Sequence, residues 1–132
     1  MGNPLFNAMD RNIIIVDDDI VLAEIVKEMI VNINDKNNVR YFTDPRNALE
    51  CIRQRDVHAI ITDYSMPGMN GVELLERAPS VKTKIIMSGS FSGNPELENS
   101  CKDKGFFTLQ KPFRWDQFRD FLEERGLGAT NG

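Results

Sequence analysis

The sequence is poor in the residues that form most zinc and redox sites. It has two cysteines, Cys51 and Cys101, and one histidine, His58, among 132 residues. The cysteines lie in separate segments, without the CxxC spacing of a zinc or thiol–disulfide motif. We therefore expect both thiols to be buried and unreactive, as free cysteines usually are.

Long apolar runs and an excess of basic residues are also missing. No stretch of about 18 apolar residues appears, and the N-terminus lacks the basic and apolar regions of a secretion signal. The net charge is −4 and the pI is near 5.0, whereas nucleic-acid-binding domains usually carry a basic patch. These absences argue against a membrane protein and against direct nucleic-acid binding, and they predict a cytoplasmic protein.

The remaining composition is that of one folded domain. Apolar residues make up 41% of the chain and charged residues 27%, so enough apolar surface is available to build a core. No linker or internal repeat divides the sequence. We expect a domain over residues 11–125, an N-terminal tail over residues 1–10 and a frayed C-terminal tail over residues 126–132.

Short apolar runs alternate with longer helical patterns. The run from Ile13 to Val16 is apolar throughout, which is typical of a strand buried on both faces. Five β–α repeats predict an α/β fold with a single doubly wound, five-stranded parallel sheet, right-handed crossovers and helices on both faces. The predicted strands are 13–16, 39–42, 57–62, 84–87 and 106–109, and the predicted helices are 20–33, 45–52, 72–75, 95–104 and 115–122.

Polar residues follow four of the predicted strands. Asp17 and Asp18 come after the first strand, Asp63 after the third, Ser88 after the fourth and Lys111 after the fifth. Ligands of open α/β sheets bind at this carboxyl edge. Carboxylates held close together repel one another unless a cation neutralises them, and Mg²⁺ is the hard, oxygen-seeking ion suited to such a cluster. The pattern therefore predicts a magnesium site.

Each of these residues alone has a simpler explanation. The acidic run from Asp17 to Asp19 is explained equally well by capping of the following helix. Asp63 also fits a turn, Ser88 a loop hydroxyl and Lys111 a solvated surface lysine. The functional interpretation depends on their joint position.

A lysine and a hydroxyl beside a carboxylate–metal cluster suit a phosphoryl group. Phosphoryl transfer requires mainly in-line positioning and neutralisation of charge. Lys111 and Ser88 would contact the phosphoryl oxygens, and the ionised Asp63 would attack phosphorus to form an acyl phosphate. Asp63, Ser88 and Lys111 are thus the candidate catalytic residues, with Asp63 as the phosphoacceptor.

Four motifs then resemble the receiver domains of two-component response regulators over essentially the whole span of residues 11–125. The resemblance implies the sheet order 2-1-3-4-5 and a cis peptide between Lys111 and Pro112. It also implies that Asp18 and Asp63 bind Mg²⁺ directly, that Asp17 acts mostly through water and that the Ser65 carbonyl is the backbone ligand. The motifs are Ile-Ile-Val-Asp-Asp-Asp at 14–19, Asp-Tyr-Ser-Met-Pro-Gly-Met-Asn-Gly at 63–71, Ile-Ile-Met-Ser-Gly at 85–89 and Lys-Pro-Phe at 111–113.

By this resemblance the protein is a signalling phosphoacceptor rather than an enzyme, with at most self-catalysed phosphorylation and dephosphorylation. Asp63 would take a phosphoryl group from a histidine kinase or a histidine phosphotransfer protein. The modification would alter the surface formed by the fourth helix, the fifth strand and the last helix. That surface would contact an output protein or domain, or a second copy of the chain.

The sequence departs from the receiver pattern at four places. Ser88 replaces the commoner threonine and keeps the hydroxyl. The stretch 71–84 is short, which predicts a trimmed third helix or exit loop. Thr108 stands where many receivers have a switch aromatic, so the usual coupling through that ring is in question. Arg114 stands where a capping Asp, Ser or Thr often begins the last helix.

Three other interpretations are weaker. A Mg²⁺-dependent phosphohydrolase with an aspartyl-phosphate intermediate would need a second aspartate where Ser65 stands, and a cap over its substrate. A non-phosphorylated interaction module would have the same fold, and Thr108 is the residue that favours it. A phosphohistidine donor would need an available histidine, whereas His58 lies at a strand start and is interpreted as structural.

Overall fold

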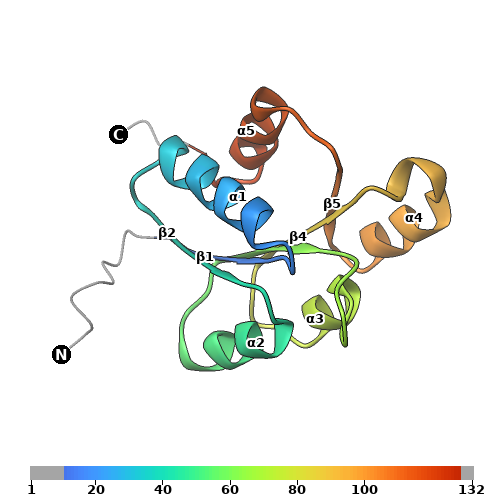
Figure 1. Ribbon diagram of the computed structural model, residues 1–132, viewed down its shortest axis with the longest axis horizontal. Helices are drawn as coiled ribbons and strands as arrows, with labels where there is room; N and C mark the ends of the chain where they lie inside the picture. The colour runs from blue at the N-terminus through green and yellow to red at the C-terminus, as the bar shows by residue number, and fades with distance from the viewer. Residues whose placement is uncertain (1–10, 129–132) are drawn as a thin grey trace.

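The computed structural model describes residues 11–128 and has the predicted architecture. Five parallel strands form one sheet in the order β2-β1-β3-β4-β5, as predicted (Figure 1). The elements in chain order are β1 (Arg11–Val16), α1 (Ile20–Ile33), β2 (Asn37–Phe42), α2 (Pro45–Gln54), β3 (Ala59–Asp63), α3 (Gly71–Glu76), β4 (Thr83–Ser88), the 3₁₀ turn η1 (Phe91–Gly93), α4 (Pro95–Asp103), β5 (Phe107–Gln110) and α5 (Trp115–Glu124).

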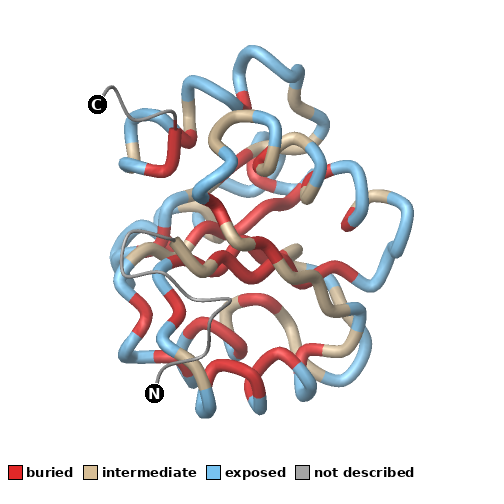
Figure 2. The backbone as a smooth tube through the Cα atoms, turned by 90° about the vertical axis from the view of Figure 1, so that its left-hand side faces the viewer, coloured by how far each residue is buried: buried red, intermediate tan, exposed pale blue. Residues whose placement is uncertain are grey.

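The helices cover both faces of the sheet. Helices α1 and α5 lie on one face, α2 and α3 lie on the other, and α4 lies beside the β4–β5 edge (Figure 1). The central strands are buried between these layers, as the red segments of Figure 2 show. β1, β3 and β4 therefore consist largely of apolar residues, because each is covered on both sides.

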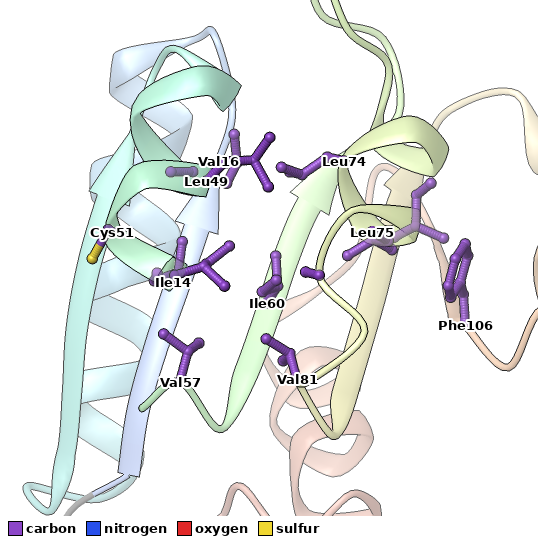
Figure 3. Close-up of a cluster of buried hydrophobic side chains, with 14 of the residues drawn as sticks. Ile14, Val16, Leu49, Cys51, Val57, Ile60, Leu74, Leu75, Val81 and Phe106 are labelled. Carbon is purple, nitrogen blue, oxygen red and sulfur yellow. The ribbon is translucent and has the colours of Figure 1, made fainter. Parts of the chain in front are cut away.

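Alternating strand residues divide the core into two clusters. Ile14 of β1 and Ile60 of β3 pack with α2 and α3 (Figure 3), whereas Ile15 and Ile61 pack with α1 and α5. This division follows from the period of two in a strand. Both cysteines are buried, as predicted.

Two helices begin with a capping side chain followed by proline. The Asp44 side chain accepts from the backbone N–H of Arg46, and the Asn94 side chain accepts from the N–H of Leu97; proline follows each cap. Helix α3 spans only Gly71–Glu76, which agrees with the short stretch in the sequence. The Lys111–Pro112 peptide is cis, as the resemblance implied.

The end of the chain differs from the expectation of a frayed tail beginning at residue 126. Leu127 is only 3% exposed. Arg11 donates to the carbonyls of Gly126 and Gly128, and the Asn37 side chain donates to the Leu127 carbonyl at 3.3 Å. The packed domain therefore extends to residue 128, because an isolated leucine after α5 adds to the core. Residues 129–132 and the predicted tail 1–10 lie outside the described residues.

None of the helices over residues 11–128 combines the length and the apolar character that crossing a membrane requires.

Candidate functional site

Three aspartates meet at the carboxyl edge of the sheet. Asp17 and Asp18 follow β1, and Asp63 ends the neighbouring strand β3. Each offers a carboxylate oxygen, and these oxygens lie within 4.8 Å of one another. The prediction from the sequence that Asp17, Asp18 and Asp63 lie close together is confirmed.

Asp19 accounts for the cap of the first helix. Its Oδ1 accepts from the backbone N–H of Val21 at 3.0 Å and of Leu22 at 3.2 Å. Asp17 instead uses Oδ1 to accept the N–H of Asp19 at 2.9 Å, which orients the Asp17 carboxylate. Capping therefore explains one member of the acidic run, and the other two remain at the site.

Lys111 supplies a positive charge to the cluster. Its Nζ lies 3.2 Å from Asp63 Oδ1 and 3.7 Å from Asp17 Oδ2. The Lys111 backbone N–H donates to the Ser88 carbonyl at 2.9 Å. This bond fixes the start of the loop over residues 111–114, called the lysine loop below, against the end of β4. One ammonium faces three carboxylates, so the cluster retains an excess of negative charge.

Asp17 is the most deeply buried carboxylate of the cluster. Its side chain is 1% exposed, and burial raises its pKa, with the Asp63 and Asp18 carboxylates acting in the same direction. The N–H of Asp19 and the Lys111 ammonium oppose this rise. Within the described chain, Asp17 Oδ2 has no hydrogen-bond partner, since the Lys111 contact is too long for one. A buried, unsatisfied carboxylate oxygen in an acidic cluster fits a divalent cation.

Asp63 is the carboxylate that opens onto a pocket. Its side chain is 13% exposed, and its Oδ1 also accepts the N–H of Tyr64 at 3.0 Å. The pocket has a volume of about 630 Å³. Its polar side comprises Asp63, Ser65, Ser88, Gly89, Ser90 and Lys111, and its apolar side comprises Leu22, Ile25, Val26 and Met29 of α1 together with Pro112 and Phe113.

Ser88 lies at the end of β4 and is 4% exposed. Its Oγ accepts from the N–H of Ser90 at 3.0 Å, which leaves the hydroxyl hydrogen available as a donor. Ser88 and Ser65 both line the pocket that holds Asp63. All five strand-end residues predicted from the sequence therefore surround one site.

Sequence reasoning missed Gln110, the residue before Lys111. Its Nε2 donates to the Gly89 carbonyl at 3.0 Å, and its Oε1 accepts the N–H of Ser92 at 2.8 Å. Thr108, two residues earlier on β5, donates from Oγ1 to Glu98 Oε2 at 3.1 Å. In the sequence, Thr108 and Gln110 are visible only as two polar residues that alternate with apolar ones on β5. Their partners lie on α4 and in the loop before it, so the sequence pattern did not identify the contacts.

Comparison with protein families identifies the family of the domain. The model of the response regulator receiver domain matches residues 13–123. The chain belongs to this family. Receiver domains are components of two-component signalling that interact with histidine kinases or phosphotransfer proteins and with output domains, and they are not enzymes in the usual sense. Phosphorylation and magnesium are general features of the family.

Individual relatives agree with the receiver assignment. The putative two-component response regulator ARR21 of Arabidopsis thaliana is 35% identical over 76% of this chain, and the chain spans 16% of that protein's length. A chemotaxis protein CheY homolog of Campylobacter jejuni is 27% identical over 91% of this chain and 96% of its own length.

A solved structure has the same fold. The receiver domain of sensor histidine kinase PA1611 from Pseudomonas aeruginosa has a TM-score of 0.71 and 20% identity, and the match covers 91% of this chain and 99% of that one. That receiver domain has a magnesium ion coordinated in its active-site cleft.

Proposed function

We propose that this receiver domain accepts a phosphoryl group on Asp63 from the phosphohistidine of a histidine kinase or a phosphotransfer protein in the cytoplasm. The observation that carries the proposal is the position of Asp63 in the open pocket that Ser88 also lines, 3.2 Å from Lys111 Nζ. A nucleophilic carboxylate, a cation and a hydroxyl donor are the groups that phosphoryl transfer requires.

Transfer would replace one bond to phosphorus with another. An Asp63 carboxylate oxygen attacks phosphorus while the bond from phosphorus to the donor imidazole nitrogen breaks, and the electron pair of that bond returns to the nitrogen. The Lys111 ammonium offsets the charge of the phosphoryl oxygens, and the Ser88 hydroxyl donates to one of them. Water later attacks phosphorus, which releases phosphate and restores the Asp63 carboxylate.

The acidic cluster fits Mg²⁺. Asp18 and Asp63 would bind the ion directly with the Ser65 carbonyl, and the unsatisfied Oδ2 of Asp17 would be neutralised through water. When bound, the ion supplies positive charge that offsets the phosphoryl oxygens. The magnesium in the cleft of the Pseudomonas receiver supports this assignment.

The phosphodonor would dock over α1. Ile20, Val21 and Ile25 are 51%, 62% and 47% exposed, and Trp115 at the start of α5 is 39% exposed. Ile25 and Met29 line the apolar side of the Asp63 pocket, so this surface is continuous with the site. A contiguous apolar patch on a soluble domain marks an interaction surface. We therefore assign it to the protein that presents the phosphohistidine.

Phosphorylation would switch a second surface, formed by α4, β5 and α5. Attraction of Ser88 toward the phosphoryl group would shift an equilibrium between two arrangements of this surface. An output protein or domain, or a second copy of the chain, would bind one arrangement more tightly than the other.

Intact mass after incubation with acetyl phosphate and Mg²⁺ tests the proposal. Wild type is expected to gain one phosphoryl group, and Asp63→Asn none. Asp56→Asn, at an exposed position in the loop before β3, is the matched control and is expected to behave as wild type. Beryllofluoride with Mg²⁺ should also change the fluorescence of Trp115, which lies four residues after Lys111.

Other outcomes would identify the alternatives. A phosphoryl group that persists in Asp63→Asn would exclude Asp63 as the acceptor. Repeated turnover of an unrelated phosphomonoester would indicate a phosphohydrolase. An absence of any response to acetyl phosphate and beryllofluoride would indicate a non-phosphorylated interaction module.

A further inference from the structure

Two polar side chains of β5 hold the segment that leads from the site into α4. Thr108 and Gln110 are two residues apart and therefore point to the same face of the sheet. Thr108 pairs in register with Ile86, and Gln110 pairs with Ser88. Ile86 belongs to the cluster that includes Cys101 of α4, whereas Leu109 between the pair belongs to the opposite cluster. The pair thus faces the α4 side.

Gln110 holds two points of the segment that follows β4. Its amide nitrogen donates to the Gly89 carbonyl and, at 2.7 Å, to the Lys111 carbonyl, and its amide oxygen accepts from the Ser92 N–H. Gly89 is bonded to Ser88, the hydroxyl donor of the proposed phosphoryl site. A displacement of Ser88 toward Asp63 therefore acts directly on a hydrogen bond of Gln110.

Thr108 fastens α4 itself. Its hydroxyl donates to Glu98 in the first turn of α4, and the same Glu98 oxygen lies 3.4 Å from Lys102 Nζ. Three side-chain hydrogen bonds from two residues thus join β5 to the segment 89–98. The Thr108–Glu98 bond is half-buried, whereas the two Gln110 bonds to this segment are exposed. Each of the three bonds can be made or broken, which suits the set to a switch.

We propose that Thr108 and Gln110 form a polar clamp that transmits the state of Asp63 to α4, in place of a moving aromatic side chain. The proposal rests on the proposed phosphorylation of Asp63. Ser88 moves toward the phosphoryl group, the Gln110 bonds to Gly89 and Ser92 rearrange, and the Thr108–Glu98 bond carries the change to the exposed face of α4. Both residues are positioning residues, since neither contacts the reacting atoms.

Amide hydrogen exchange of the full chain measures the clamp directly. Gln110→Leu removes both loop contacts with little change in size, and Thr108→Val removes only the hydroxyl. Without any phosphoryl mimic, Gln110→Leu should speed exchange at the Ser92 N–H by roughly five- to tenfold, and Thr108→Val should speed exchange in α4 by a similar factor. Thr108→Ser, which keeps the hydroxyl, should restore wild-type exchange. Gln54→Leu on α2 and Thr83→Val at the start of β4 are matched controls and should change neither.

The second measurement separates the clamp from the phosphorylation it serves. With beryllofluoride and Mg²⁺, wild type should change exchange in both 63–71 and α4, whereas the Thr108→Val, Gln110→Leu double variant should change only 63–71. The double variant should still gain one phosphoryl group from acetyl phosphate. An α4 response of wild-type size in the double variant would overturn the clamp, as would unchanged Ser92 exchange in Gln110→Leu.

Failure of the proposed function gives a different result. If wild type gains no phosphoryl group, the acceptor assignment fails, and the exchange rates without the mimic alone decide whether the clamp exists. Thermal unfolding of each variant verifies that it is folded, and Thr108→Val keeps the test available if Gln110→Leu unfolds.

Discussion

Gly71 lies against the backbone carbonyl of Asp63. A Cβ at Gly71 would lie 2.5 Å from the Asp63 oxygen and 3.0 Å from Ile86 Cδ1. The Gly71 N–H also donates to the Tyr64 carbonyl at 2.8 Å, so the start of α3 closes the loop that follows the acceptor residue. The close approach favours a residue without a side chain, because a Cβ would lie well inside contact distance of a backbone carbonyl.

Gly71→Ala is expected to destabilise the protein by about 1–3 kcal/mol, as overpacking usually does, and to slow phosphorylation of Asp63 by acetyl phosphate. The reason is that the methyl group must displace the Asp63 backbone. Urea denaturation and intact mass measure the two effects. Gly93→Ala is the control, since a Cβ there meets no atom within 4 Å among the described residues. Equal stability of the two variants would contradict the steric argument.

Asp17 gives a stability effect that depends on pH. Burial raises its pKa, so the folded state binds the carboxyl proton more tightly than the unfolded state does. The ionised carboxylate therefore reduces stability as the pH rises through that raised pKa. In metal-free buffer, Asp17→Asn should increase the free energy of unfolding at about pH 7, and the gain should shrink as the pH falls toward about 4.

Urea denaturation of wild type and Asp17→Asn across this pH range checks the expectation. Asparagine retains an oxygen that can accept the Asp19 N–H, so the contact that orients the side chain is preserved. Asp35→Asn, at an exposed turn, controls for the loss of one negative charge. A stability difference that stays constant with pH would show that the Asp17 carboxylate is not its source.

Magnesium should stabilise wild type and its removal by EDTA should reverse the effect. At a concentration about 100 times the dissociation constant, the expected gain is about 2.7 kcal/mol. Asp18→Asn should lose most of this gain because it removes a proposed ligand. Asp19→Asn should keep it, because asparagine still caps α1 and Asp19 uses its oxygen on Val21 and Leu22. Thermal unfolding with and without Mg²⁺ distinguishes the two variants.

The aromatic contact beneath the lysine loop supports the position of Lys111. Phe118 of α5 is fully buried and stacks on Phe113 at a centroid distance of 4.9 Å. Phe118→Ala should cost about 3–5 kcal/mol of stability, measured by urea denaturation. Phe107→Ala is the comparison, because Phe107 is 40% exposed and contacts Arg125 from its surface side. A similar cost at both positions would mean that burial does not set the effect.

The sheet and most of the site could be predicted from the sequence because both are consequences of local pattern. Apolar runs at Ile13–Val16 and in β3 and β4 identify strands buried on two faces, and parallel order brings their polar ends together. Local pattern alone did not divide the acidic run, since Asp17, Asp18 and Asp19 all fit a helix cap equally well. The resemblance to receiver domains selected Asp17 and Asp18 as the site residues, and the hydrogen bonds of Asp19 identify it as the capping residue.

Contacts between elements that are far apart in the sequence could not be predicted either. Gln110 resembles any polar residue of an edge strand until Gly89 and Ser92 are placed beside it. Leu127 lies beyond the last helical pattern, so no period marks it as buried. Arg11 and Asn37, which hold the backbone around it, lie outside the predicted strands 13–16 and 39–42.

The contacts of Arg11 with Gly126 and Gly128 bring the two ends of the described domain together at the edge of the sheet opposite Asp63. A circular permutant that joins these ends with a short linker would therefore leave the phosphoryl pocket unaltered. A fluorescent protein or an affinity tag attached at residue 128 would likewise project away from the surface on α1 that receives the donor. The same arrangement makes the domain a convenient insertion module, because both connections to a host protein leave from one side.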